Sequence, residues 1–291
     1  MIVAIALVLV AVGSVAFHFW SPWWWTPIAS NWGYIDDTII ITFWITGVVF
    51  IAVVLFTAWC AYRYRYREGN RAEYEPENTK LEWQLTICTT IGAGVMLTPG
   101  LWAWNDFVNV PEEAAEMEVV ARQWDWSYRF PGKDGILGKT DFRLINDDNP
   151  FGVDPKDPNG KDDVLVDDSE LHMPMGKPIK VLLRSLDVLH DFYVPEFRAK
   201  MDLVPGAVTY FWLTPIRTGT FDILCFELCG LGHHAMRGQV VVEEESAFNA
   251  WLGEQETFAQ SMARSGSGAD DELKLVENKD QTNSTEREVA K

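Results

Sequence analysis

Three long apolar runs occupy the first third of the chain, and they contain almost no charged position. Residues 1–20 and 38–62 carry no charged side chain, and residues 81–104 carry only Glu82. Each run reaches the roughly 20 residues that a helix needs to cross a lipid bilayer. The pattern therefore predicts three membrane-spanning helices, the second and third of which form a hairpin.

From residue 116 onward the apolar runs become short, alternate with polar positions and end at Gly, Pro or Asp, which is typical of β-strands. Several short strands with no helix between them predict a Greek-key sandwich or barrel. The predicted strands are residues 118–122, 124–130, 179–184, 207–213, 221–225 and 239–243.

The basic residues predict how the chain crosses the bilayer. None precedes Arg63, none lies between Lys80 and Arg122, and the loop between the second and third apolar runs is rich in them. Loops with an excess of Lys and Arg stay in the cytoplasm. That loop is therefore predicted to be cytoplasmic, and the segment 21–37 and everything after residue 104 are predicted to lie outside.

Two interpretations of the first apolar run are open. It lacks the basic start of a secretory signal, which favours a retained membrane helix, whereas the small residues of Ser14-Val15-Ala16 would permit cleavage. The loop that follows is predicted to form an aromatic belt at the membrane interface. Its members are Trp23, Trp24, Trp25 and Trp32.

These patterns divide the chain into four segments: residues 1–37 with the additional helix, the helical hairpin 38–105, an exported β domain over 106–245, and the end, 246–291. Within the β domain, residues 133–176 are rich in Asp, Gly and Pro but lack the spacing of an EF-hand, so a solvated acidic insertion is expected. A short helix is expected over 246–258, and a disordered acidic tail from about residue 261.

Charge narrows the choice of partners. The formal net charge is −18, with 42 acidic side chains against 24 basic ones, and most of the acidic residues follow the membrane segments. A strongly acidic exported domain argues against a nucleic-acid partner and favours electrostatic steering of a basic protein.

Candidate metal chemistry is concentrated in one loop, Cys-Phe-Glu-Leu-Cys-Gly-Leu-Gly-His-His-Ala-Met over residues 225–236. Cys229, His233 and Met236 supply a thiolate, an imidazole and a thioether, the set typical of a mononuclear blue-copper site. Cys225 adds a second thiolate, and two thiolates can bridge two metal ions. His190 offers a second imidazole, so the sequence predicts a two-copper electron-transfer centre.

Two other interpretations of the cysteine pair remain. In an exported domain the pair could form a disulfide, and two Cys with two His could hold a structural zinc, although zinc needs no Met. The Met and the glycine-flanked loop favour copper. His234 is interpreted as a residue at the rim, His172 is given no role, and Cys60 and Cys88 are interpreted as apolar packing residues.

Together these motifs resemble subunit II of the haem-copper cytochrome c oxidases, the subunit that carries the binuclear CuA centre. The resemblance covers residues 38–245. It rests on the metal loop, on Gln123-Trp124-Asp125-Trp126-Ser127-Tyr128, and on Asp187-Val188-Leu189-His190 continued by Val194-Pro195 and Asp202-Leu203-Val204-Pro205-Gly206. It implies transmembrane helices followed by a cupredoxin-like Greek-key β-sandwich or barrel, in a bacterial inner membrane with the C-terminal domain on the periplasmic face.

The resemblance also implies a complete set of copper ligands. Cys225 and Cys229 would bridge the two coppers. One copper shell would be completed by His190 and Met236, and the other by His233 and the backbone carbonyl of Glu227.

Three further roles follow from the resemblance. The side chain of Glu227 would contribute to a magnesium site shared with subunit I. Trp124 would be the exposed aromatic residue that takes electrons from cytochrome c, while Trp126, two positions along the same predicted strand, is the better candidate for the core. Glu82 would lie near a proton-uptake route, or else is an interfacial charge.

The chain departs from the family pattern at a few positions. Asp125 stands where the family has an aromatic residue, and Leu85 and Thr89 replace a Trp and a Pro of the third apolar run. The acidic insertion and the additional first helix are not among the family's core features.

The expected function is that of subunit II of a terminal oxidase. It would accept electrons from cytochrome c at the copper centre and pass them to the haem of the catalytic subunit, where oxygen is reduced to water with proton translocation. The alternatives are the CuA subunit of a nitric oxide reductase, a copper-free quinol-oxidase-like subunit, and a copper-delivery protein. No Cys-x-x-Cys-His motif for covalent haem occurs in the chain.

Overall fold

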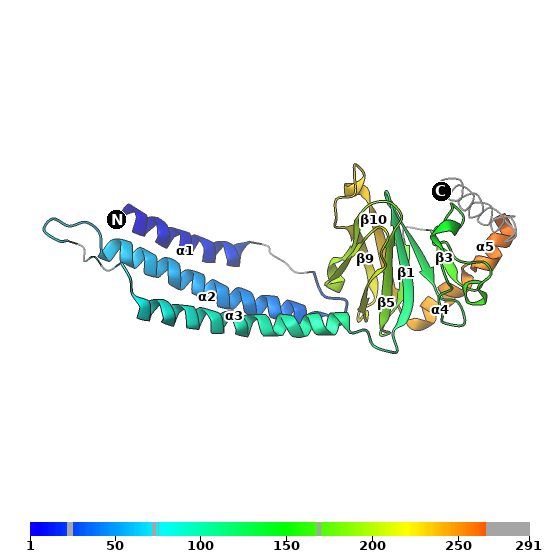
Figure 1. The fold of residues 1–291 in the computed structure, drawn as a ribbon, viewed down its shortest axis with the longest axis horizontal. Helices are drawn as coiled ribbons and strands as arrows, with labels where there is room; N and C mark the ends of the chain where they lie inside the picture. Colours follow the sequence, from blue (N-terminus) through cyan, green and yellow to red (C-terminus); the bar gives the residue numbers. More distant parts are fainter. Residues whose placement is uncertain (22–25, 72–73, 75, 168–169, 266–291) are drawn as a thin grey trace, which may run out of the picture. The chain divides into compact units, whose positions relative to one another are not determined.

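A computed structural model describes residues 1–21, 26–71, 74, 76–167 and 170–265. The chain divides into two compact units, which are described separately (Figure 1). The helical unit comprises Met1–Thr26 and Gly33–Asp106, and the β unit comprises Pro27–Trp32 and Phe107–Lys291. The short segment between the first two helices therefore belongs to the β unit, whereas the sequence pattern grouped it with the additional N-terminal helix.

Three long helices form the helical unit: α1 (Ile2–Trp20), α2 (Gly33–Arg63) and α3 (Thr79–Val108). Each is long and apolar enough to cross a membrane, as the uninterrupted apolar runs predicted. Most of their large apolar side chains are exposed, which suits helices whose surroundings are lipid rather than water.

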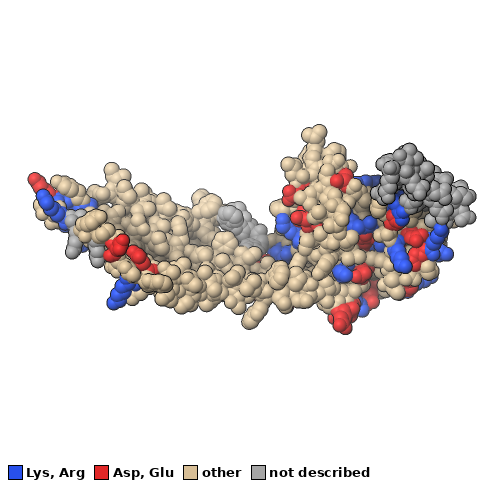
Figure 2. Space-filling model, in the orientation of Figure 1, with Lys and Arg blue, Asp and Glu red and all other residues tan. Residues whose placement is uncertain are grey.

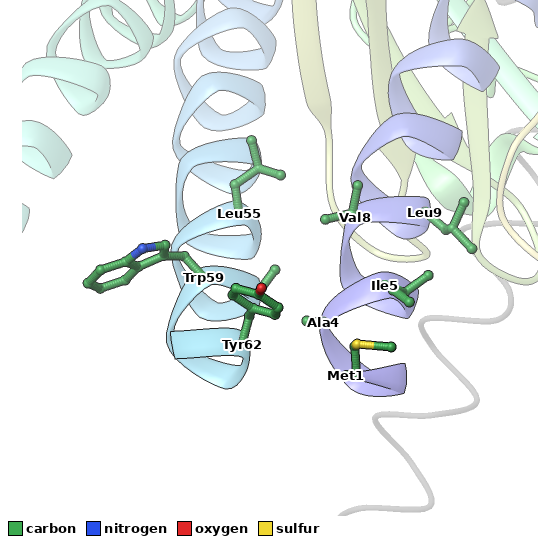
Figure 3. Close-up of a pocket in the computed structure, with 9 residues that line it drawn as sticks. Met1, Ala4, Ile5, Val8, Leu9, Leu55, Trp59 and Tyr62 are labelled. Carbon is green, nitrogen blue, oxygen red and sulfur yellow. The ribbon is translucent and has the colours of Figure 1, made fainter. Parts of the chain in front are cut away.

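Helix α1 packs on α2 through small residues. The buried residues of the two helices are Ala4, Ala11 and Ala58, whose short side chains let the backbones approach closely. Beside this contact lies an apolar groove of about 560 Å³ (Figure 3). It is lined by residues of the first half of α1, such as Ile5, and by residues near the end of α2, such as Tyr62. The two helices are therefore antiparallel, as the predicted topology requires.

Among the described residues of the β unit, ten strands form two five-stranded sheets (Figure 1). The first sheet has the order β3-β2-β1-β5-β8, and the second has the order β4-β10-β9-β6-β7. The first contains β1 (Ala115–Arg122), β2 (Asp125–Phe130), β3 (Val164–Val166), β5 (Ile179–Ser185) and β8 (Thr209–Leu213). The second contains β4 (Glu170–Pro174), β6 (His190–Val194), β7 (Ala199–Leu203), β9 (Gly219–Cys225) and β10 (Arg237–Glu243).

The alternation of apolar and polar positions places the core between the sheets. Every second residue of β5 is buried, beginning with Ile179, because successive side chains of a strand point to opposite faces. Trp126 and Phe192 meet edge to face, with ring centroids 5.5 Å apart and an interplanar angle of 89°. The pairs β1–β5 and β4–β10 are parallel and the others antiparallel. The predicted two-sheet β architecture is confirmed.

The prediction of a solvated loop over residues 133–176 is wrong. This segment contributes β3, β4 and two 3₁₀ turns, Phe142–Leu144 and Pro158–Gly160. Phe151 and Val153 are fully buried, and with Val120 they form a small apolar cluster. The apolar residues are spaced too irregularly among Asp and Gly for a periodic pattern, so only long-range packing reveals them. β6 and β7 also escaped prediction, because polar residues interrupt them.

Two helices end the described residues: α4 (Glu245–Glu254) and α5 (Phe258–Ser265). Helix α5 completes the small cluster, with Phe258 2% and Met262 9% exposed. Disorder was expected from about residue 261, but α5 continues to Ser265 because Met262 packs against this apolar cluster. The remaining predicted tail, 266–291, lies outside the described residues.

The segment Pro27–Trp32 docks on the β unit at residues far along the chain. The backbone N–H of Ala29 donates to Glu196 O at 2.7 Å, and that of Ile216 donates to Ala29 O at 2.9 Å. Trp32 is fully buried, packs on Trp212 with ring centroids 4.7 Å apart, and donates from Nε1 to the carbonyl of Trp212 at 2.9 Å. Trp32 is therefore a core residue and not a member of an interfacial belt; Trp23, Trp24 and Trp25 lie outside the described residues.

The distribution of charge follows the two units. On the face shown in Figure 2, the charged side chains of the helical unit lie near the helix ends and the connecting loop, while charges of both signs cover the β unit. Glu118, Arg129 and Asp163 are buried together: Arg129 pairs with Glu118 and with Asp163, the latter at 2.9 Å, and Glu118 also pairs with the half-buried Arg184.

Candidate metal centre

Two strands and one loop bring the predicted ligands together. His190 is the first residue of β6 and Cys225 is the last of β9. These strands are antiparallel, with Phe192 opposite Cys225, so the start of one lies beside the end of the other. The loop after Cys225 then returns over the site through a 3₁₀ turn, His233–Ala235, before β10 begins.

The donor atoms of this loop and strand face one another at short range. The two thiol sulfurs, of Cys225 and Cys229, lie 3.7 Å apart. Each sulfur faces one imidazole nitrogen: Cys225 Sγ lies 3.9 Å from His190 Nδ1, and Cys229 Sγ lies 3.6 Å from His233 Nδ1. The arrangement is two sulfurs in the middle with one imidazole on either side.

Two weaker donors complete the cluster. The thioether sulfur of Met236 lies 3.8 Å from Cys229 Sγ, and the backbone carbonyl of Glu227 lies 3.3 Å from Cys225 Sγ. His190, Cys225 and Cys229 offer ligand atoms within 4.8 Å of one another and are all buried. The structure thus brings together every ligand named from the sequence.

Burial and the short distance between the two sulfurs shift the pKa values of the two thiols in opposite directions. Burial raises the pKa of the Cys225 thiol, but hydrogen bonds from His190 and from backbone N–H groups outweigh it and lower that pKa to about 6. Burial and the neighbouring Cys225 sulfur raise the pKa of Cys229 to about 12. The two pKa values move in opposite directions because two thiolates this close repel each other, so Cys225 is the thiol that loses its proton more readily.

The donor set fits copper better than the two other interpretations. A disulfide requires sulfurs about 2.05 Å apart, whereas these are 3.7 Å apart and both thiols are free. Tetrahedral zinc takes four ligands, but six donors converge here, including a soft thioether. Two thiols, two imidazoles and a thioether are the soft donors that copper prefers.

Asp187 supports the site from outside the ligand set. Its Oδ1 lies 2.8 Å from His190 Nε2, so that ring nitrogen carries a proton for the carboxylate while the other ring nitrogen, Nδ1, faces Cys225. Burial raises the pKa of Asp187, but the hydrogen bonds from His190, Val188 and Gln123 outweigh it and hold that pKa below its usual value. Sequence analysis assigned Asp187 no role, although a carboxylate three residues before a ligand His was a signal.

Trp124 lies against the metal loop. It precedes β2 in a turn, is 42% exposed, and donates from Nε1 to the carbonyl of Cys229 at 3.3 Å. The side chain of Gln123 donates to the same carbonyl at 2.8 Å. Trp126 is 1% exposed, with its ring 6.5 Å from that of His190. As predicted, Trp124 is the more exposed of the two, but it does not share a strand with Trp126.

The remaining candidates lie apart from the donor cluster. The side chains of Glu227 and His234 are exposed on the metal loop, and Glu82 is exposed in the first turn of α3. His172 was given no role, but its ring stacks on Trp251 of α4 at 4.1 Å and its Nδ1 lies 2.9 Å from Glu243. His172 therefore helps hold α4 against the second sheet.

Comparisons with known proteins agree with this site. Residues 116–244 match the family model described as cytochrome c oxidase subunit II, periplasmic domain. The alternative cytochrome c oxidase subunit 2 of Bradyrhizobium diazoefficiens is 62% identical over 259 residues, which cover 89% of this chain and 94% of that protein. The cytochrome c oxidase subunit 2 of Cereibacter sphaeroides is 26% identical over 241 residues, covering 78% of this chain and 77% of that protein.

A solved structure is also similar. The crystal structure of the periplasmic domain of subunit II of cytochrome oxidase of Bradyrhizobium japonicum is 30% identical, covers 50% of this chain and 95% of that chain, and has a TM-score of 0.37.

Apolar helices followed by a two-sheet domain with a buried Cys, His and Met cluster define a membrane-anchored copper-binding subunit of an electron-transfer complex. With 62% identity over nearly the full length of both chains, the chain belongs to the cytochrome c oxidase subunit II family. It is a subunit of the haem-copper cytochrome c oxidase complex, with helices in the membrane and a periplasmic β domain.

Proposed function

We propose that this subunit holds a binuclear CuA centre and is the point at which electrons enter the oxidase. The observation that carries the proposal is the pair of thiol sulfurs 3.7 Å apart, each facing one imidazole nitrogen. Cys225 and Cys229 would bridge two coppers, with His190 and Met236 on one and His233 and the Glu227 carbonyl on the other. When bound, the copper pair supplies a one-electron relay between an external donor and the haem of the catalytic subunit.

The protein's own residues hold this centre rigid and dry. His190 is fully buried, Met236 is 1% exposed and Cys229 is 3% exposed, so these three ligands are shielded from water. Asp187 fixes the imidazole of His190, and β6 and β9 anchor the ends of the ligand set. Ligands fixed on a rigid scaffold need not rearrange when the charge of the site changes.

Trp124 is the proposed electron entry point, because it is exposed on one side and touches the metal loop on the other. The proposed donor is a basic cytochrome c, attracted by the acidic chain with its net charge of −18. The exposed side chain of Glu227 is proposed to contribute to a magnesium site with subunit I, and Glu82 to a proton-uptake route.

The alternatives have less support. The relatives are named cytochrome c oxidase subunits, which favours that complex over a nitric oxide reductase. A copper-free structural subunit would have no use for six converging donors. A copper-delivery protein needs an accessible, labile site, whereas most of these ligands are buried.

Copper stoichiometry and electron paramagnetic resonance of the purified full chain test the proposal. We expect two coppers per chain that share one unpaired electron, and we expect Cys225→Ser to give a mononuclear signal or none. Cys88→Ser, a substitution in α3, is the matched control and should keep the two-copper signal. One copper, zinc, or a two-copper signal that survives Cys225→Ser would overturn the proposal.

A further inference from the structure

The indole of Trp124 lies on the backbone of the metal loop at a point where the loop has no side chains. Its Nε1 donates to the carbonyl of Cys229 at 3.3 Å, and the next residues under the ring are glycines. A Cβ on Gly232 would lie 2.3 Å from Trp124 Cδ2, 2.7 Å from Cγ and 2.8 Å from Cε2. Real Cβ atoms do not approach other heavy atoms so closely, so any side chain at position 232 must displace the ring or the loop.

The glycine at position 232 is not required by its backbone conformation. Its φ of −85° and ψ of 3° are open to residues other than glycine. Gly230, two residues earlier, has a φ of +117°, which L-residues other than glycine rarely adopt. The two glycines therefore serve different purposes: Gly230 allows the turn, and Gly232 leaves room for the ring.

The loop at Gly232 has little freedom to give way. Its carbonyl accepts hydrogen bonds from the N–H of Ala235 at 2.9 Å and of Met236 at 3.1 Å, which close the turn that carries His233. Met236 is in turn buried beside Cys229. The indole is 42% exposed and has solvent to move into. A side chain at position 232 would therefore push the ring outward rather than move the ligands.

We propose that Gly232 is a positioning residue for electron entry: by having no side chain, it lets Trp124 lie directly on the metal loop beside His233. This inference rests on the proposed function of Trp124 and of the copper centre. The contact shortens the gap that an electron crosses between the exposed ring and the ligands. A larger residue at position 232 lengthens that gap while leaving the ligand atoms in place.

The test is a double-mutant cycle in the full chain with Gly232→Ala, Trp124→Ala and the double variant. Copper content and paramagnetic resonance report on the ligands, and stopped-flow oxidation of reduced cytochrome c reports on electron entry. We expect Gly232→Ala to keep the wild-type copper signal and to slow electron uptake several-fold, because the displaced ring lies farther from the ligands. In the Trp124→Ala background, Gly232→Ala should cause no further loss.

Two controls separate the role of Gly232 from the proposed electron entry through Trp124. Gly253→Ala, in α4 with no heavy atom within 4 Å of the added Cβ, should keep the wild-type rate of electron uptake.

Thermal unfolding of the metal-free proteins measures the contact between Gly232 and Trp124 without any electron transfer. Gly232→Ala should lower the melting temperature only when Trp124 is present. Additive losses in this cycle, a full rate in Gly232→Ala, or an altered copper signal would each overturn the role of Gly232. A full rate of electron uptake in Trp124→Ala would instead overturn Trp124 as the entry point. The unfolding measurements on the metal-free proteins would still show whether Gly232 and Trp124 are in contact.

Discussion

The carboxylate of Asp187 joins two elements of the site, because it holds the ligand His190 through Oδ1 and the backbone N–H of Gln123 through Oδ2, at 2.8 Å and 2.6 Å. Gln123 directly precedes Trp124, so one side chain ties His190, a proposed copper ligand, to the turn that carries the exposed indole. Hydrogen bonds to the second nitrogen of a ligand His fix its tautomer and orientation.

Asp187→Asn should weaken copper binding by roughly 10- to 100-fold, since an amide is a poorer partner for the His190 N–H than a carboxylate. Competitive titration of copper against a chelator of known affinity measures the change. Asp222→Asn, an exposed position on β9, is the control and should bind copper like the wild type. Equal affinities in all three proteins would show that Asp187 does not support the ligand.

Electron uptake from a basic cytochrome c should fall steeply with salt. The chain carries a net charge of −18, and exposed charges are screened beyond about 8–10 Å at moderate ionic strength. Steered association speeds encounter by roughly 10- to 1,000-fold at low salt. Stopped-flow rates over a range of salt concentrations measure this, with a small uncharged reductant as the control. A salt-independent rate with cytochrome c would indicate that charge does not guide the donor.

Asp163 should make the β unit more stable as the pH falls from 7 towards 5. Burial raises the pKa of Asp163 to about 6, against an ordinary value of 3.8, even though Arg129 lowers it. Between these two values the folded state binds more protons than the unfolded state, so the free energy of unfolding rises as the pH falls. Among the described residues, Asp163 Oδ1 is buried without a hydrogen-bond partner, so the burial of the charged form is incompletely compensated.

Chemical unfolding of the wild type and of Asp163→Asn at pH 7 and pH 5 isolates this contribution. The asparagine variant should be less stable at both values, because Arg129 loses a charged partner. The wild type should also gain stability on acidification relative to the variant. Parallel pH profiles for the two proteins would mean that Asp163 does not titrate in this range.

Trp32→Ala should destabilise the β unit by about 3–5 kcal/mol, the usual cost of truncating a fully buried aromatic residue to alanine. Trp32 lies far from the β strands in sequence, but it packs on Trp212 and Phe107. Calorimetry of the full chain measures the effect, and Ile136→Ala, at a side chain that is 55% exposed, is the control. If both variants unfold like the wild type, the docked segment contributes no stability.

The proposed ligands could be named from the sequence because their chemistry is unusual and mostly local. Cys225, Cys229, His233 and Met236 lie on one loop, and few proteins place two thiols, an imidazole and a thioether so close together. The supporting residues could not be named in this way. Asp187, Gln123 and Gly232 are ordinary residue types, and their roles depend on which atoms they meet across the two sheets.

The membrane helices and most strands were also predicted, because long apolar runs and strict alternation are local properties of the chain. The sequence by itself determined three apolar spans, a β domain after them and the set of candidate metal donors. Only the tertiary structure decided that Trp32 is buried, that residues 133–176 supply strands and core, and that Trp124 rests on Gly232. Those outcomes depend on packing between segments far apart in the chain, and hydrophobic periodicity contains no information about which distant surface an apolar residue will meet.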